Sequence, residues 1–180
     1  MNHLATSKED ILAASRDLIK ENGWAAVSIR AVASRCSVSA GTIYNYYESK
    51  ADLLSDTIES IWHEIFFHPE DEQVFHDVES CISWIYERLE YGNRQFPGFF
   101  SLHSFGFMRD EKTSGKKRMM KTWGHILNGL CEVLGNDPKV RADVFDQEFT
   151  EKKFADILFS LILVSMIRQD YDPSSVLMLV

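Results

Sequence analysis

Small, hydroxyl-bearing and polar aromatic residues follow one another between positions 38 and 54, in the sequence VSAGTIYNYYESKADLL. Ser39 and Ser49 each precede a helical pattern and are typical N-cap residues, so we expect two helices to start here. The residues between the two serines are too polar for a core and too aromatic for a solvent loop. A short helix that begins with small and hydroxyl-bearing residues suits insertion into a groove of DNA.

The segment offers candidate residues for both kinds of contact that such a helix makes, with bases and with phosphates. Small or hydrogen-bonding residues at its start are assigned to base edges, namely Ala40, Gly41 and Thr42. Neutral donors further along are assigned to phosphates, namely Tyr44, Asn45 and Tyr46. Lys50 lies in the first turn of the next helix, where a cation is disfavoured by about 0.3–1 kcal/mol unless an anion binds there. We therefore assign Lys50 to a phosphate, the alternative being an ordinary solvated lysine.

Hydrophobic spacing predicts the helices that hold this segment. Ser7 with Asp10 resembles a capping box for a helix that ends near Gly23. Ser28 is expected to cap a short second helix, and Ser37 and Val38 to form a tight turn into the third. Ile43 and Tyr47 are expected to face inward from the third helix. Two short helices separated by about three residues fit a helix-turn-helix.

The rest of the chain also has helical periodicity. Five further helices are expected: from Ser49 to about Phe67, from Val78 to about Leu89, from Met119 to about Leu134, from Gln147 to Gln169, and from Asp172–Pro173 onward. The expected fold is all-α, with a three-helix head, a long fourth helix, and a helical body. Residues 1–50 are predicted to be the helix-turn-helix domain and residues 51–180 the body.

Charge is distributed unevenly along the chain. The net charge is −8, but residues 1–50 hold six Lys/Arg against five Asp/Glu, whereas residues 51–180 hold thirteen against twenty-two. DNA binding depends on the local potential of the docking face, so a weakly positive head on an acidic body remains compatible with it. The three cysteines are widely spaced and form no zinc-like pair. We expect a cytoplasmic protein with no signal peptide, no membrane association, and no metal or cofactor.

Residues 7–66 resemble the N-terminal domain of the TetR/AcrR transcription regulators. The resemblance lies in the segments 11–14, Gly23–Trp24, 27–30, Val32–Ala33, Val38–Ser39, 41–47 and 49–54. It implies that Ser28 contacts a phosphate, that Thr42, Tyr44, Asn45 and Tyr46 contact bases or phosphates, and that Lys50 contacts a phosphate. The predicted DNA-binding residues are therefore Ser28, Ser39, Ala40, Gly41, Thr42, Tyr44, Asn45, Tyr46 and Lys50.

The chain departs from the family pattern at two positions. Ala40 occupies a position that is often Lys or Arg, so one phosphate or base contact is missing. Ser37 replaces a frequent Gly at the turn, which costs about 1 kcal/mol if the turn requires positive φ. The first departure predicts weaker affinity or a different base preference.

Large apolar residues are concentrated between positions 60 and 125. They either fill an ordinary core or line a cavity for a hydrophobic effector, which the resemblance implies. The predicted pocket residues are Trp62, Phe66, Trp84, Phe99, Phe100, His103, Phe107, Met119, Met120 and Trp123. His103 could orient a polar group of the effector, or be a histidine without special duty. The basic cluster formed by Lys116, Lys117, Arg118 and Lys121 is either a solvated face or a grip on an acyl-coenzyme A.

The segment from Ile157 to Ile167 is apolar all round, which predicts partners on two faces. We assign one face to its own domain and the other to a second subunit. The predicted homodimer interface consists of Phe159, Ile162, Leu163, Met166 and Ile167, with the apolar tail 176–180.

The favoured function is a dimeric repressor that binds a palindromic operator and is released by a small hydrophobic effector. The alternative is a helical binding module that acts as a co-regulator through a protein partner. An enzyme is not expected, because no catalytic triad, phosphate loop or metal spacing is present in the sequence.

Overall fold

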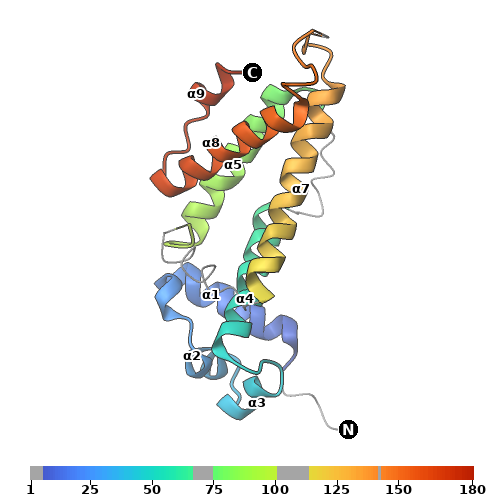
Figure 1. Ribbon diagram of the computed structural model, residues 1–180. Coiled ribbons are helices and arrows are strands. Elements are labelled where there is room, and N and C mark those ends of the chain that lie inside the picture. Colours follow the sequence, from blue (N-terminus) through green and yellow to red (C-terminus); the bar gives the residue numbers. More distant parts are fainter. Residues whose placement is uncertain (1–5, 67–74, 101–113, 142) are drawn as a thin grey trace. The chain divides into compact units, whose positions relative to one another are not determined.

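The computed structural model describes residues 6–66, 75–100, 114–141 and 143–180, without the side chains of 114–119, 121 and 122. These ranges form helices and contain no strand, so the predicted all-α fold is confirmed. In chain order (Figure 1), the elements are α1 (Lys8–Asn22), the 3-10 helix η1 (Trp24–Ala26), α2 (Ile29–Arg35), α3 (Ala40–Tyr44), α4 (Lys50–Phe66), α5 (Val78–Gln95), α7 (Ser114–Asn136), α8 (Glu151–Arg168) and α9 (Ser174–Leu177).

Serine hydroxyls start the first four α-helices, as the sequence predicts. The Ser7 hydroxyl accepts from the N–H of Asp10 at 3.1 Å, and the Asp10 carboxylate accepts from the N–H of Ser7 at 2.8 Å. Ser28, Ser39 and Ser49 each accept from the N–H three residues further on, at 3.1 Å. Each bond satisfies a backbone donor that has no partner inside its helix.

The turn between α2 and α3 has the conformation that favours glycine. Ser37 has φ +56° there. The N–H of Ser37 donates to the Ser34 carbonyl at 3.1 Å, and the N–H of Val38 donates to the Ala33 carbonyl at 2.9 Å. These two bonds end α2 and direct the chain into α3. The turn therefore does require positive φ, and serine rather than glycine at position 37 costs about 1 kcal/mol of stability.

Residues distant in sequence complete the core of the head. The chain divides into two compact units, and unit 1 contains residues 1–67 together with 92–119. In unit 1 the Trp62 ring of α4 lies 5.5 Å from Phe66, 5.7 Å from Phe99 and 5.6 Å from Phe100. Phe99 also lies 6.1 Å from Trp24 in η1. The segment 96–100 thus packs directly against the connection between α1 and α2.

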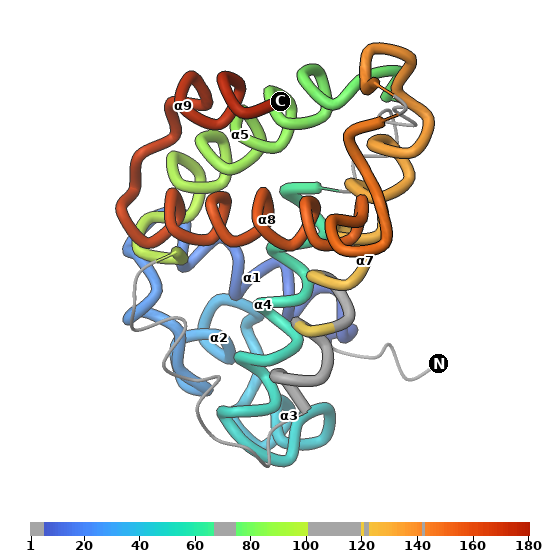
Figure 2. The backbone as a smooth tube through the Cα atoms, turned by 45° about the horizontal axis from the view of Figure 1, so that its top comes forward, coloured from blue at the N-terminus to red at the C-terminus, as the bar shows by residue number. Residues whose placement is uncertain are grey.

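Unit 2 contains residues 68–91 and 120–180. Within it α5 and α8 lie side by side in both views (Figures 1 and 2), and the hydroxyls of Tyr86 and Ser165 hydrogen-bond at 2.8 Å. At the start of α5, the buried Asp137 carboxylate accepts from the N–H of Val78 at 2.8 Å. Trp123 of α7 and Phe159 of α8 meet edge to face at 5.7 Å. Side chains of three helices therefore build the core of unit 2.

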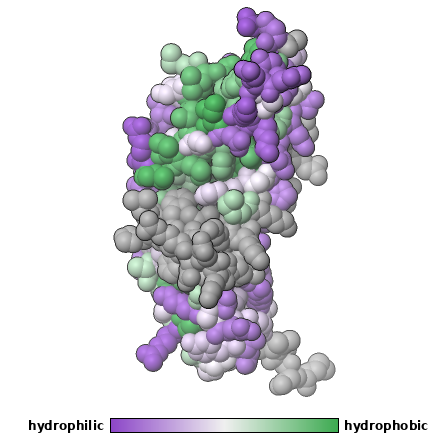
Figure 3. All heavy atoms as spheres, viewed as in Figure 1, coloured by the Kyte–Doolittle hydropathy of each residue, from purple (hydrophilic) through white to green (hydrophobic). Residues whose placement is uncertain are grey.

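Helix α8 has one buried and one exposed apolar face. The buried face consists of Ala155, Leu158, Ile162 and Met166. The exposed face contains Ile157, Val164 and Ile167, whose exposed fractions are 47%, 46% and 51%. Figure 3 shows apolar surface gathered over unit 2.

These burials change the predicted dimer interface. Ile162 and Met166 are only 3% and 1% exposed, so a second subunit has almost no surface of theirs to contact. Their assignment to the interface is wrong, because the protein's own fold covers them. Phe159 and Leu163 are half-buried, and Ile167 is exposed.

The compact units divide the chain differently from the predicted domains. The predicted boundary follows residue 50, whereas unit 1 includes α4 and the segment 92–119. The functional division at residue 50 stays a prediction. None of the described helices is both long and apolar enough to cross a membrane.

Candidate nucleic-acid interface

Helix α3 separates its side chains into an inward and an outward set. Ile43 and Tyr47, just beyond the helix end, are 0% and 3% exposed, as predicted. Ser39, Gly41, Tyr44 and Asn45 are exposed, with Tyr44 at 54%, while Ala40, Thr42 and Tyr46 are half-buried. A large aromatic left in water beside small polar groups is unusual for a side chain that only supports a fold. The structure thus exposes four of the nine predicted contact residues at α3 and leaves Ala40, Thr42 and Tyr46 half-buried beside them.

Gly41 is not required by the packing of the protein. A Cβ added there would lie 3.5 Å from the Ser39 Oγ, which is an ordinary contact. Its φ is not positive, and the residue is exposed. The fold therefore gives no reason for a glycine, whereas close approach of a DNA backbone or base edge gives one.

Tyr46 forms a hydrogen bond that the sequence does not indicate. Its hydroxyl donates to the carbonyl of Thr6 at 2.6 Å and is half-buried. A phenol has one proton to donate, and a phosphate offers only acceptors, so this hydroxyl is not available to a phosphate. This bond joins Thr6, two residues before α1, to Tyr46, two residues beyond α3, and so helps to position α3. A contact of Tyr46 with DNA stays a prediction.

Six Lys and Arg side chains lie in residues 1–50, and four of them pair with acids of the same unit. The pairs are Lys8 with Asp56, Arg16 with Glu9 and Glu64, Lys20 with Glu64, and Arg35 with Asp17 and Glu21. The hydrogen bonds between Arg35 and Glu21 lower the pKa of Glu21 and raise the pKa of Arg35, so both side chains remain charged at neutral pH. Most of the positive charge of the head is therefore neutralised internally.

Arg30 and Lys50 are the two remaining cations, and both are exposed. Neither forms an ion pair with any residue in the described ranges of the chain. Lys50 is the first residue of α4 and Arg30 the second of α2, so each lies at a helix start, where an anion is favoured. The sequence reasoning missed Arg30, although the argument used for Lys50 applies to it equally.

Ser28 is placed as a phosphate ligand would be. Its oxygen accepts from the N–H of Ala31 and thereby caps α2. Its hydroxyl proton makes no hydrogen bond to the described part of the chain. One hydroxyl can therefore cap the helix and donate to a phosphate at the same time.

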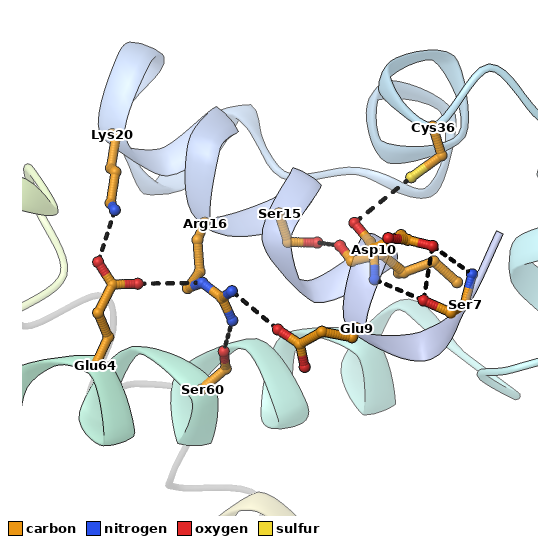
Figure 4. A network of polar contacts seen from close by, with 10 residues as sticks. Ser7, Glu9, Asp10, Ser15, Arg16, Lys20, Cys36, Ser60 and Glu64 are labelled. Atoms are coloured by element: carbon orange, nitrogen blue, oxygen red, sulfur yellow. Dashed lines mark hydrogen bonds and ion pairs between the residues drawn. The ribbon is translucent and has the colours of Figure 1, made fainter. Parts of the chain in front are cut away.

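A polar network fixes α1 to α4 (Figure 4). Glu64 accepts from the Lys20 Nζ at 2.6 Å and lies 3.2 Å from the Arg16 Nε. Arg16 also donates to the Ser60 hydroxyl. Arg16 and Glu64 are only 18% and 24% exposed, so solvent screens this network less than it screens a surface pair. The network therefore holds α4, which carries Lys50, against α1.

The predicted effector residues do not form one described site. Trp62, Phe66, Phe99 and Phe100 pack against one another and are at most 7% exposed. Trp84 pairs with Phe75 at 5.2 Å, Trp123 pairs with Phe159, and Met120 is 56% exposed. His103 and Phe107 lie outside the described residues, as do the side chain of Met119 and those of the basic cluster 116–118 and 121. The pocket stays a prediction.

One buried donor in this set has no partner. The indole N–H of Trp123 is enclosed and has no acceptor within the described residues. An unpaired buried donor costs about 1–3 kcal/mol, so an acceptor supplied by a ligand would be favoured there. The described ranges contain no group of three His, Cys, Asp or Glu side chains that could hold a metal ion.

Comparison with known proteins gives a match in the head. Residues 11–57 match the family model of the bacterial regulatory proteins of the tetR family. The HTH-type transcriptional regulator UidR of Escherichia coli (strain K12) is 38% identical over 48 residues, which are 27% of this chain and 24% of UidR. The chain therefore matches about a quarter of the length of its curated relatives.

Solved structures extend the likeness of the fold to the body. A transcriptional regulator from Rhodococcus sp. RHA1 has a TM-score of 0.66 at 18% identity, over 94% of this chain and 86% of its own. A TetR regulator from Haloarcula marismortui has 0.67 at 20%, over 88% and 83%. FadR from Bacillus subtilis in complex with stearoyl-CoA has 0.62 at 16%, over 94% and 88%. At these identities the likeness establishes the fold of the body, whereas the match to the family model covers residues 11–57 of the head.

Proposed function

We propose that the chain is a DNA-binding transcriptional regulator of the TetR family, which binds a palindromic operator as a homodimer and is released by a small apolar effector. The observation that carries the proposal is the exposed face of α3 between Arg30 and Lys50. Small, hydroxyl and amide groups occupy this face. Arg30 and Lys50, which form no ion pair within the described residues, lie at the starts of the neighbouring helices α2 and α4. Base contacts from α3 and phosphate contacts from the two helix starts follow the docking geometry of a helix-turn-helix.

The exposed face of α8 supports the homodimer. Ile157, Val164 and Ile167 are separated by seven and three residues and so lie on one helix face. Ser160, between them in sequence, is also exposed, and its hydroxyl is satisfied by the Asp156 carbonyl at 2.8 Å. Leaving three large aliphatic side chains half in water is unfavourable, and a second copy of the same face would cover them. We assign the dimer interface to this face.

The aromatic residues support an apolar effector with at least one hydrogen-bond acceptor. The unpaired Trp123 N–H would donate to that acceptor, while Phe159 contacts the same ring. FadR from Bacillus subtilis is described in complex with stearoyl-CoA, an apolar chain joined to a carbonyl. An acyl thioester is therefore one effector class to test, and other apolar compounds that carry a hydrogen-bond acceptor are tested beside it.

DNA binding is tested by fluorescence anisotropy with an operator selected from a random duplex library. Lys50→Gln removes two phosphate contacts from a dimer, so the slope of log K against log salt concentration should become shallower by about 1.8. Arg30→Gln should have a similar effect. Lys152→Gln, at an exposed lysine of α8, is the matched control and should leave both affinity and slope unchanged.

Two results would contradict the proposal. The first is that Lys50→Gln and Arg30→Gln bind the selected operator with the affinity and salt dependence of the unaltered protein. The second is that no duplex is enriched by selection while a protein partner is captured, which would favour the co-regulator alternative. Effector release is measured in the same assay by adding candidate ligands to the bound complex, with Trp123→Phe as the variant that should lose the response.

A further inference from the structure

A cavity of about 340 Å³ lies wholly within unit 2 and includes no residue assigned above to DNA or effector contact. It shares only Leu179 and Val180 with the tail 176–180 that the sequence assigns to the dimer interface. It is bordered by the start of α5, the end of α7, the connecting segment 137–150, the first turn of α8 and residues 179–180. In Figure 1 the connecting segment is the orange loop between α7 and α8. The volume falls at the lower end of the range for small-molecule sites.

The walls of this cavity are fixed by hydrogen bonds. Asp137 accepts from the N–H of Val78 and from that of Lys139, each at 2.8 Å. Asp146 accepts from the N–H groups of Glu148 and Phe149 at 2.7 and 2.6 Å. These bonds fix the backbone around residues 137–139 and 146–149, so a ligand would find these parts of the site preformed.

Three phenylalanines form an aromatic cluster in the apolar lining of the cavity. Phe145, Phe149 and Phe154 lie 5.8–6.2 Å from one another, centre to centre. Phe149 is 38% exposed and Val144 37%, so part of this apolar lining faces water. Covering it with a hydrocarbon or aromatic group would be favourable by about 25 cal/mol per Å² of apolar surface.

Both charged residues that line the cavity are cations. Lys139 is shared between Asp77 at 3.2 Å and Glu79 at 3.4 Å, so its charge is already balanced. Arg141 is 76% exposed and lies 3.4 Å from Asp143 through its Nε, and its Nη atoms make no hydrogen bond within the described part of the chain. A guanidinium with free Nη atoms presents the fork that binds a carboxylate in two parallel hydrogen bonds.

We propose that this cavity is a second ligand site, which binds a small aromatic or aliphatic carboxylate. The carboxylate lies on the Nη atoms of Arg141, and the apolar body lies against Phe145, Phe149 and Phe154. The site shares no residue with the predicted effector pocket, so it does not depend on the proposed function. A regulator with two such sites would respond to two chemical signals.

The test uses 4-phenylbutyrate as the probe and 4-phenylbutan-1-ol as its neutral counterpart, with binding to the full chain measured by isothermal titration calorimetry. The acid should bind at least tenfold more tightly than the alcohol. Arg141→Gln should remove that preference, and Arg141→Lys should retain part of it because the charge stays while the fork is lost. Phe149→Ala should weaken acid and alcohol by the same factor.

Arg168→Gln is the matched control, because Arg168 is also an exposed arginine in unit 2 whose partner, Asp170, lies two residues further on, at 3.9 Å. It should leave binding of the acid unchanged. The proposal is overturned if the acid fails to bind at millimolar concentration, if it binds Arg141→Gln as tightly as the unaltered protein, or if Arg168→Gln weakens it equally. Operator binding without ligand should be unaffected by Arg141→Gln, so failure here and failure of the proposed function are distinguishable.

Discussion

Gly92 lies where α5 packs against the end of α4, and its replacement by alanine tests how closely unit 1 is packed. A Cβ at this position would lie 2.6 Å from the Ile65 Cδ1 and 3.1 Å from both the Ile65 Cγ1 and the Phe100 Cζ. Ile65 and Phe100 are 0% and 1% exposed, so neither can move aside into solvent. Overpacking of this kind costs about 1–3 kcal/mol, against about 1 kcal/mol gained from the helix propensity of alanine. We expect Gly92→Ala to lower the free energy of unfolding by about 1 kcal/mol.

The companion substitution is Ile65→Val, which deletes the Cδ1 that would lie nearest the new methyl group. Alone it should lower the free energy of unfolding by about 1 kcal/mol, because it removes one buried methyl. In the double variant the alanine Cβ occupies the vacated space, and the propensity gain is kept. The two changes together should therefore destabilise less than either alone, with a coupling free energy of about 2 kcal/mol.

Urea denaturation of the four proteins, followed by tryptophan fluorescence, gives the required free energies. Two of the four tryptophans, Trp24 and Trp62, belong to unit 1, so part of the signal reports on the packing in question. The reasoning is refuted if Gly92→Ala alone is as stable as the unaltered protein. It is also refuted if the two single effects add to within about 0.5 kcal/mol, which would mean that the side chains do not interact.

Three further substitutions test features of the head and of α5. Ser37→Gly should raise the free energy of unfolding by about 0.5–1 kcal/mol, because glycine adopts φ +56° without strain; Ser34→Gly, inside α2, should lower it in the same urea assay, and equal signs would contradict this account. Tyr46→Phe should lower it by about 1 kcal/mol through loss of the bond to Thr6, with operator affinity within about twofold; a large loss of affinity at unchanged stability would show that the hydroxyl contacts DNA. Hydrogen bonds from Ser80, with a smaller contribution from Lys139, lower the pKa of Asp77 to about 2. Its charged form therefore stabilises the fold above about pH 4, and this stabilisation is lost as the pH falls from about 4 to 2. Asp77→Asn should make thermal stability less steep in that window, and parallel curves for the two proteins would exclude the effect.

Local chemistry explains what could be predicted from the sequence. A serine cap and the N–H that it accepts are three residues apart, so Ser7, Ser28, Ser39 and Ser49 mark helix starts without knowledge of the fold. The positive φ of Ser37 follows from the same short-range logic. The most informative part of the candidate site, the exposed face of α3, is one short helix and was predictable for that reason.

Contacts between residues far apart in the sequence are the features that could not be predicted. The bond from Tyr46 to Thr6 spans 40 residues, and that from Lys20 to Glu64 spans 44. Neither pattern nor propensity indicates such a pair, so the sequence predicts a DNA contact for Tyr46 but not its bond to Thr6. Helix α8 posed a related difficulty, since a segment that is apolar all round carries no periodic signal of which face is buried. Ile162 and Met166 were assigned to the wrong face as a result.

The packing of Phe99 on Trp24 and Trp62 bears on how regulators of this kind can be recombined. A chimera made by joining residues 1–66 to an unrelated body would separate two tryptophans from the rings that cover them. Residues 92–100 must accompany the transplanted head, or the recipient body must supply equivalent rings. The portable DNA-reading part of this protein is therefore discontinuous in sequence, and a successful graft requires two junctions more than a simple fusion.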